Sequence, residues 1–391
     1  MKSPFTMGGA SLAFLLTFFP FLLAQNVETK EGVRLVHNVK GGTWGATAKV
    51  DIKLVKKLGD VDSQNENLAF SSPGDIVEDR DGNLYIVDSE NFRILKFNKG
   101  GDFIISFGRK GQGPGEFSSI RSLSIDRMGR LHALDDTQRK IQIFSTEGRA
   151  LQSIRLLKGN IDCFRSMEGD LYVVHESVPG RQVVEQKALL KIIDAKESVK
   201  SEFCAPQDYG ESVTNQVGNS FHFTVGRDGS IIVSFAFQNR IEKYTPQGKL
   251  VWKADRPLNF ETKVLEKGKY EASANMTRYT GPKMNSCSRG VAVDDTGRSW
   301  VLTYRRQIKP EEVISVSRSF SAAGVTIKRT GNTDLRATDM YQLEVFDREG
   351  ILLGAIPLSH FADGIWIFQD RLYLLDRDRG VTYYQYKIME R

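Results

Sequence analysis

The chain has few cysteines and few histidines for its length. Three cysteines (Cys163, Cys204 and Cys287) and five histidines occur among 391 residues. So few cysteines exclude a disulfide scaffold, and packing must therefore supply the stability. The cysteines can form one bridge and leave one free thiol, or all three can be buried and unreactive.

Several catalytic signatures are also absent. We find no G-x-S-x-G elbow, no His-Glu-x-x-His helix, no Walker loop and no dinucleotide fingerprint. Gly108 to Gly115 is rich in glycine, but it joins one predicted strand to another and does not open a helix, so it is not a phosphate cradle. The charge is mild, at +6 from 54 basic and 48 acidic residues. Because the basic residues are scattered, we expect no nucleic-acid partner.

The sequence has one apolar run of the kind that targets a chain, from Ala10 to Ala24 behind Lys2. It ends at the polar pair Gln25-Asn26, which is typical of a secretory signal peptide. We therefore expect residues 1–24 to be a signal, residues 25–49 to be an extended lead-in, and the protein to be exported to the periplasm or the medium. An uncleaved membrane anchor is the alternative.

The rest of the chain is organised around Glu78 to Gly108, because the pattern of this stretch returns. We predict a four-stranded antiparallel unit here. A first strand leads into a turn at Asp81-Gly82-Asn83, and the strands Leu84 to Val87 and Arg93 to Phe97 follow. A second turn then leads to the strand Phe103 to Phe107. The first turn has six copies, centred on Gly82, Gly129, Gly169, Gly229, Gly297 and Asp370.

Six units of four strands predict an all-β fold, a six-bladed β-propeller in one domain over residues 50–391. The last unit offers three strands, and the alternating strand from about residue 50 to 58 completes it and closes the ring. Extra residues accumulate in three insertions, Glu202 to Phe221, Asp255 to Arg289 and Tyr304 to Met340. We expect a monomer.

Two motifs carry a resemblance to a known family. Phe107 to Phe117 reads FGRKGQGPGEF, and Asp88 to Ile94 reads DSENFRI. These stretches resemble the blade linker and the strand-two to strand-three turn of NHL-repeat propellers. The first two blades match well, and later blades keep only the core of the repeat. The resemblance implies a six-bladed propeller that binds through one rim, where all three insertions fall.

Two rings of residues are expected at that rim. The inner ring is Asp75, Ser122, Asp162, His222, Gly290 and Asp363. Asp75, Asp162, His222 and Asp363 could hold Ca²⁺ or Zn²⁺. We favour the alternative, in which they bond to channel water and to neighbouring backbone, because no spacing among them is diagnostic of a metal site.

The second ring is Asp88, Asp135, His175, Phe235, Thr303 and Asp376. The aspartates fit turn caps. The blades beside the insertions depart from the repeat at His175, Phe235 and Thr303, which indicates a ligand site. Nearby arginines could select an anion, and Arg93, Arg139 and Arg240 could instead pack between blades. They are Arg93, Arg139, Arg240, Arg305 and Arg306.

Aromatic and basic residues in the insertions have the composition of a recognition surface. They are Tyr209, Phe260, Tyr270, Tyr279 and Phe320, with Arg278, Arg305, Arg306 and Arg318. The leading hypothesis is an exported, non-catalytic binding or scaffold module without a cofactor, for a protein, peptide or glycan. The alternatives are a metal-dependent hydrolase or lyase at the channel mouth, and a structural component of an envelope complex. Fold alone does not decide among them.

Overall fold

A computed structural model describes residues 26–45, 47–60, 63–176, 187–273, 276–321 and 324–391, with the backbone alone for 270–279 and 318–327. The predicted signal at residues 1–24 lies outside the described residues. So do the side chains of five residues expected in a recognition surface, Tyr270, Arg278, Tyr279, Arg318 and Phe320.

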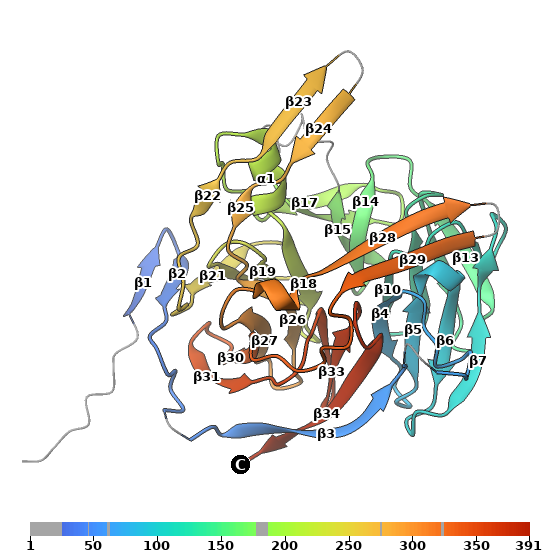
Figure 1. Ribbon diagram of the computed structural model, residues 1–391, viewed down its shortest axis with the longest axis horizontal. Helices are drawn as coiled ribbons and strands as arrows, with labels where there is room; N and C mark the ends of the chain where they lie inside the picture. Colours follow the sequence, from blue (N-terminus) through green and yellow to red (C-terminus); the bar gives the residue numbers. More distant parts are fainter. Residues whose placement is uncertain (1–25, 46, 61–62, 177–186, 274–275, 322–323) are drawn as a thin grey trace, which may run out of the picture.

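Six four-stranded antiparallel sheets surround a central channel, which confirms the predicted six-bladed β-propeller (Figure 1). Within each blade the first strand lies innermost and each later strand lies farther out. Blade 1 consists of β4 (Pro73–Glu78), β5 (Leu84–Asp88), β6 (Arg93–Phe97) and β7 (Phe103–Phe107). Blade 2 consists of β10 (Ser122–Ile125), β11 (Leu131–Asp135), β12 (Lys140–Phe144) and β13 (Ala150–Arg155). Blade 3 consists of β14 (Ile161–Ser166), β15 (Leu171–Glu176), β16 (Leu190–Asp194) and β17 (Val199–Phe203).

The second half of the ring repeats this plan with longer connections. Blade 4 consists of β18 (Phe221–Val225), β19 (Ile231–Phe235), β20 (Ile241–Tyr244) and β21 (Leu250–Asp255). Blade 5 consists of β26 (Ser288–Val293), β27 (Ser299–Tyr304), β30 (Tyr341–Phe346) and β31 (Leu352–Pro357). Blade 6 consists of β32 (Gly364–Phe368), β33 (Arg371–Asp376), β34 (Thr382–Glu390) and β3 (Val50–Leu58).

In blades 1, 2 and 5 the turn between the first two strands is held by an aspartate and by a glycine with positive φ. In blade 1 the Asp79 carboxylate accepts hydrogen bonds from the backbone N–H groups of Asp81 and Asn83, at 3.0 and 2.9 Å. Gly82 has φ +84°, a conformation that glycine adopts without steric cost. In blade 6 Gln369 takes the left-handed conformation, with φ +57°. The eroded sixth copy of the repeat therefore keeps the turn with a different residue.

The core consists of layers between blades. The described residues form six buried apolar clusters, and each cluster joins two neighbouring blades. Strand formers such as Ile86, Val173 and Val301 bury one face against the next blade. A single blade cannot cover both faces, so the ring is stable only when it is complete.

The amino-terminal strand β3 closes the ring, as the sequence predicted. β3 pairs antiparallel with β34, from Val50 opposite Glu390 to Leu58 opposite Tyr383. Val50 is fully buried and Leu58 is 5% exposed. The first and last parts of the chain thus lie in one sheet along the outer edge of blade 6 (Figure 1).

The lead-in forms a hairpin that the sequence did not predict. β1 (Asn26–Lys30) and β2 (Val33–His37) pair antiparallel, and β2 adds to β21 in parallel, so the blade 4 sheet has six strands. Asn38 fastens the hairpin, because its amide donates to the carbonyls of Asp255 and Gly350 at 2.9 and 3.0 Å. These partners are more than 200 residues away in sequence, so local patterns could not indicate them.

The two ends of the channel differ. We call the end with the blade linkers and the loops between second and third strands the insertion rim, and the end with the turns between first and second strands the turn rim. The predicted insertions lie on the insertion rim and contain α1 (Ser212–Gly218), β22 (Val264–Glu266), β23 (Lys269–Ser273), β24 (Met276–Thr280), β25 (Lys283–Met284), η3 (Pro310–Glu312), β28 (Ile314–Ser321) and β29 (Gly324–Gly331). The same rim carries η1 (Ser89–Asn91), β8 (Arg109–Lys110) and β9 (Glu116–Phe117).

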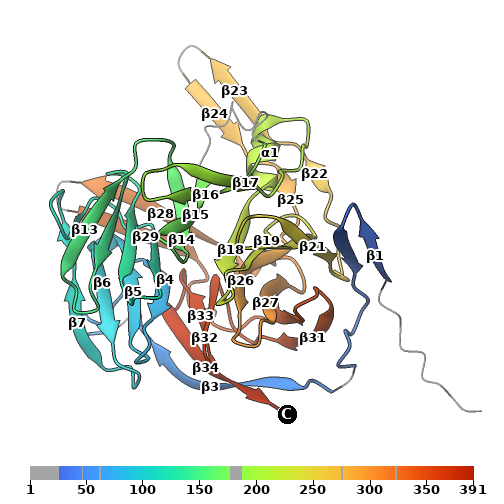
Figure 2. The same ribbon diagram turned by 180° about the vertical axis from the view of Figure 1, so that it is seen from behind.

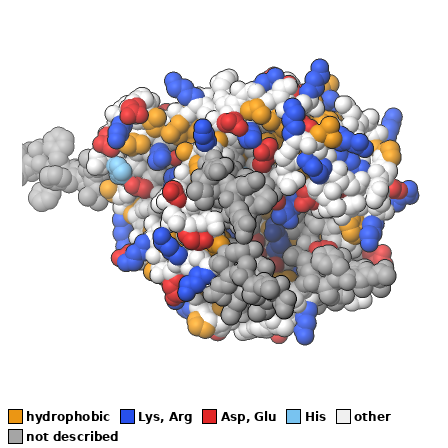
Figure 3. Space-filling view, turned by 90° about the horizontal axis from the view of Figure 1, so that it is seen from above, with side chains coloured by type: hydrophobic (Ala, Val, Ile, Leu, Met, Phe, Trp, Pro, Cys, Tyr) orange, Lys and Arg blue, Asp and Glu red, His pale blue; other side chains and the backbone are white. Residues whose placement is uncertain are grey.

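The hairpins of this rim stand apart from the blades. The β28–β29 hairpin passes in front of blades 1 and 2 in Figure 1 and behind them in Figure 2. The β23–β24 hairpin projects away from the ring beside α1 in both views. On the face drawn in Figure 3, basic and acidic side chains are interspersed, in agreement with their scatter along the sequence. No helix among the described residues is long and apolar enough to cross a bilayer.

Candidate functional site

The first insertion is ordered by one carboxylate at the start of α1. Glu211 accepts hydrogen bonds from the backbone N–H groups of Val213 and Thr214, both at 2.8 Å. Such a capping interaction satisfies donors that have no partner within the helix. The Thr214 hydroxyl donates a hydrogen bond of 2.7 Å to the same carboxylate, which positions the hydroxyl oxygen to accept another hydrogen bond.

A hydrogen bond accepted by the Thr214 hydroxyl links the first insertion to the second. The backbone N–H of Gly268 donates to Thr214 Oγ1 at 2.9 Å, a buried contact. A Cβ at Gly268 would lie 2.3 Å from the Val213 side chain, so only glycine permits this approach. The loop of β22 and β23 is therefore packed directly on α1.

The second insertion is in turn joined to the third. The amide of Gln307 accepts from the N–H of Ser286 at 2.8 Å and donates to the Ser286 carbonyl at 2.9 Å. Inside the third insertion, Arg306 forms two bonds of 2.7 Å with the Glu312 carboxylate, and Thr338 donates to the same group at 2.7 Å. Three segments that are separate in sequence thus form one bonded layer over blades 4 and 5.

This layer exposes apolar side chains to solvent. Ile308 and Val313 of the third insertion are 49% and 48% exposed, and Leu265 of the second is 45% exposed. Arg305 is exposed as well, and its side chain forms no hydrogen bond or ion pair with the residues that the structure describes. We call these four residues the insertion-rim patch. The exposed apolar side chains of this layer are available to a partner.

Most of the arginines expected to select a ligand are instead bonded to the protein. Arg93 pairs with Asp88 at 3.1 Å, and Arg240 stacks over the Phe235 ring at 3.6 Å and donates to the Ala205 carbonyl at 2.7 Å. Arg306 is held by Glu312. Arg139 donates to the carbonyls of Leu157 and Gly159 at 3.0 and 2.9 Å. Of the five arginines expected near the site, Arg305 alone forms no side-chain hydrogen bond or ion pair among the described residues.

The three residues that break the repeat do not form a common ligand site. Phe235 is fully buried and lies in the core between blades 3 and 4. Thr303 is also buried, and its hydroxyl donates to Glu344 at 2.8 Å. His175 is partly exposed and packs edge-on against Phe221, with 4.9 Å between the ring centroids. Phe235 therefore contributes to apolar packing, and Thr303 contributes to a buried hydrogen-bond network.

The inner ring is a set of ion pairs between different blades. The Asp75 carboxylate accepts two hydrogen bonds from the Arg165 guanidinium, at 3.0 and 3.2 Å, and one from the Ser122 hydroxyl at 2.8 Å. Asp162 pairs with Arg121 at 2.9 Å, and Asp363 pairs with Arg289 at 2.9 Å. Each of the three carboxylates considered as a metal ligand is thus already neutralised by a guanidinium.

His222 completes this end of the channel. Burial, together with the nearby charges of Arg289, Arg377 and Arg165, lowers the pKa of its imidazole to about 4. A neutral imidazole could ligate a metal, but among the described residues no three His, Cys, Asp or Glu side chains are arranged to hold one. The four residues Asp75, Asp162, His222 and Asp363 are therefore not brought together as a ligand set.

The three cysteines are free thiols. Cys204 and Cys287 are buried, and Cys163 is partly exposed. Burial raises the pKa of Cys163 and Cys204 to about 12 and that of Cys287 to about 11. Because the thiolate is the reactive form, none of the three has the character of a nucleophile.

Comparisons with known proteins agree with this architecture. Residues 65–290 match the family DUF5128, described as a 6-bladed beta-propeller. NHL repeat-containing protein 3 of Mus musculus is 29% identical over 123 residues, which are 29% of this chain and 35% of the mouse protein; the Homo sapiens protein matches to the same extent. The match thus spans about a third of these relatives' length. It supports the NHL-like character predicted from the first two blades.

Solved structures share the fold at low sequence identity. A member of the DUF4221 family from Bacteroides vulgatus has a TM-score of 0.54 and 10% identity, and covers 88% of this chain and 99% of its own. A putative exported protein from Bacteroides fragilis has a TM-score of 0.51 and 12% identity, and covers 91% and 99%. At this identity the likeness concerns the fold alone. Because the matched residues span more than half of the chain, the protein belongs to the 6-bladed beta-propeller family DUF5128.

Proposed function

We propose that this propeller is an exported, non-catalytic binding or scaffold module that engages a protein, peptide or glycan through its insertion rim. One observation carries the proposal: three insertions from different parts of the chain bond to one another in a single layer on one rim. A binding surface on loops that a rigid ring positions is a common arrangement in proteins.

The chemistry of the insertion-rim patch favours a polypeptide among these partners. Ile308, Val313 and Leu265 offer apolar area, and burial of such area drives protein association. Arg305, the neighbour of Arg306 in the chain, adds a guanidinium without a partner among the described residues. This group can donate hydrogen bonds to a carboxylate or a backbone carbonyl of the partner.

The test is a capture experiment with a matched control. The mature protein and its Ile308→Asp/Val313→Asp variant are immobilised, and proteins from the source cells are quantified on both. We expect recovery of the specific partner to fall about tenfold or more, because the variant places charges where apolar contacts form. Met128→Asp is the control, since Met128 is 79% exposed on the turn rim. Equal capture by all three proteins, or equal loss in both variants, would contradict the proposal.

Export is the second part of the proposal and rests on the apolar run from Ala10 to Ala24, which ends at a polar pair. The expected result is a mature protein whose first residue lies close to Gln25, in the periplasm or the medium. Amino-terminal sequencing of the protein from its source cells makes this measurement. A chain that retains residues 1–24 inside the cell would rule export out.

A metal-dependent hydrolase or lyase at the channel mouth has less support, because Asp75, Asp162 and Asp363 each pair with an arginine. One Ca²⁺ or Zn²⁺ per chain in the purified protein, lost in Asp162→Ala and His222→Ala variants, would reverse that ranking.

A further inference from the structure

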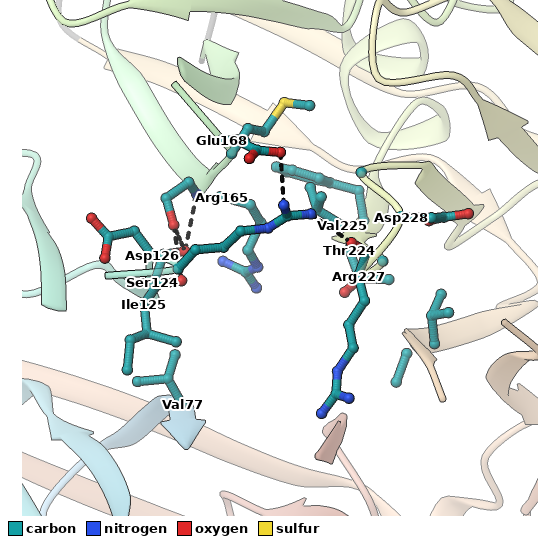
Figure 4. A pocket seen from close by; sticks show the side chains of 18 of the residues that line it. Val77, Ser124, Ile125, Asp126, Arg165, Glu168, Thr224, Val225, Arg227 and Asp228 are labelled. Atoms are coloured by element: carbon teal, nitrogen blue, oxygen red, sulfur yellow. Dashed lines mark hydrogen bonds and ion pairs between the residues drawn. The ribbon is translucent and has the colours of Figure 1, made fainter. Parts of the chain in front are cut away.

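A cavity lies at the other end of the channel, within the turn rim. It measures about 1020 Å³ and is lined by the inner strands of all six blades. Its lining combines apolar residues of the inner strands, with Val77, Ile125 and Val225 facing it from blades 1, 2 and 4 (Figure 4), and charged residues of the turns. Pockets that enclose small molecules measure roughly 300 to 1,000 Å³ and have apolar walls with a few polar groups. Both the size and the walls of this cavity therefore suit a small ligand.

Arg165 marks the inner end of the cavity. Its guanidinium reaches from blade 3 to Asp75 in blade 1 and to Ser122 in blade 2, and it lies 5.7 Å from the centre of the Phe223 ring. The lining begins just after these partners, at Ile76 and Leu123. Because Asp75 neutralises Arg165, the inner end offers little net charge to a ligand.

The mouth of the cavity carries arginines at one repeated position. Arg80, Arg127 and Arg227 each lie two residues before the glycine of their blade's first turn. Arg127 of blade 2 pairs with Glu168 of blade 3 at 2.8 Å and donates to the Arg227 carbonyl of blade 4 at 3.0 Å. Arg80 in turn donates to the Arg127 carbonyl. The three side chains thus form an arginine collar over the cavity.

The ion pairs of the collar arginines are exposed to solvent. The Arg127 and Glu168 side chains are 60% and 73% exposed, and Arg227 pairs at 2.9 Å with Asp295, where the exposures are 70% and 39%. Exposed pairs of this kind contribute little stability, so a ligand can displace the acid at small cost. No acidic side chain of the described residues forms an ion pair with Arg80, although Asp79 and Asp228 also line the cavity.

We propose that this cavity binds a small amphiphile with a single anionic head, such as a medium-chain carboxylate or an aryl sulfonate. The apolar body lies against the apolar residues of the inner strands, and the head lies among Arg80, Arg127 and Arg227. This orientation follows from the charges, because an anion at the mouth gains charge-assisted hydrogen bonds while it stays partly hydrated. The opposite orientation would place the anion beside Asp75.

The test uses the mature protein and the fluorescent probe 8-anilinonaphthalene-1-sulfonate, with decanoate and decanol as competitors. We expect saturable probe binding, displacement by decanoate, and at least about tenfold weaker displacement by decanol, which lacks the charge. In Arg127→Gln/Arg227→Gln, decanoate affinity should fall about tenfold or more. Arg109→Gln is the matched control, because Arg109 is 80% exposed and pairs with an acid on the insertion rim.

A second variant tests the cavity apart from the collar. Val225→Phe adds volume to the wall and should weaken both the probe and decanoate by about tenfold or more. Near-ultraviolet circular dichroism confirms that each variant is folded, since this probe also binds loosened states. Wild-type protein that binds no decanoate, equal affinity for decanol, or unchanged affinity in the collar variant would each overturn the proposal.

Discussion

Glu78 and Arg371 form a buried ion pair where blade 6 meets blade 1. Their side chains are 2% and 7% exposed, and Arg371 Nη2 donates to Glu78 Oε1 at 2.5 Å. Glu78 Oε2 and the Nε and Nη1 atoms of Arg371 find no hydrogen-bond partner among the described residues. Burial raises the pKa of Glu78 to about 7, although Arg371 opposes that shift. This carboxylate therefore titrates in the folded protein at a pH where an ordinary glutamate is fully ionised.

The raised pKa predicts a pH-dependent contribution to stability. The unfolded carboxyl has a pKa near 4.5, so the contribution is complete below that pH and is lost as pH rises through about 7. The loss is on the order of 1 to 3 kcal/mol. Urea unfolding between pH 4.5 and 8 should show that wild-type protein loses stability relative to Glu78→Gln as pH rises.

A comparison of variants is needed because His222 acts in the opposite direction. Its pKa is lowered from 6.5 to about 4, so it favours the unfolded state as pH falls through that interval. Glu168→Gln is the control, since Glu168 is 73% exposed and lies on the same rim. A difference curve between wild type and Glu78→Gln that stays flat with pH, like that of the control, would show that Glu78 is ionised throughout.

At this scale the sequence predicts single turns but not long-range partners. The expected capping role is confirmed for Asp135, which accepts from the Gln138 N–H at 2.8 Å, and for Asp376, which accepts from the N–H groups of Arg379 and Gly380. It is wrong for Asp88, which forms no capping bond with the described turn after it and accepts instead from the N–H groups of Ser71 and Ser72. The pairing of Asp75 with Arg165 depends on the curvature of the ring, which no repeat encodes. The arginine collar could have been found, because its members share one position of the repeat.

Among the elements, the strands of the blades can be predicted from the sequence, whereas the helix α1 and the β1–β2 hairpin cannot. The alternation of apolar and polar residues and the glycine turns locate the blades, because each strand buries one face against a neighbouring blade of the same kind. The helix α1 has seven residues, too few to be stable alone, and it depends on Glu211 and on the contact of Gly268 with Thr214. The hairpin of β1 and β2 depends likewise on β21.

The same reasoning explains why the sequence located the insertion rim but did not identify which of its side chains are free. Length alone located the three insertions, because a blade needs no extra residues. The contacts that decide which side chains are free, such as Glu312 with Arg306, form only after the insertions have folded against each other. Composition therefore indicated Arg305 and Arg306 equally, and the structure distinguishes them.

For the whole molecule, ring closure by β3 should decide whether the blades unfold as one unit. Without β3, the edge of β34 is unpaired, and the sites filled by Val50 and Leu58 are open to solvent. Burial of each such side chain is worth about 1.5 to 3 kcal/mol, and an exposed edge strand invites association between chains.

The prediction concerns two truncated chains, one that starts after residue 40 and one that starts after residue 59. The first lacks the β1–β2 hairpin but keeps β3, so it should remain monomeric and lose only part of the stability of the mature protein. The second should unfold at a lower urea concentration, with a broader transition, and should form larger species in light scattering. Because each cluster between blades needs both neighbours, the loss of one closing strand weakens the whole ring. Identical midpoints and monomeric behaviour for both truncated chains would show that the other five blades hold the ring without closure.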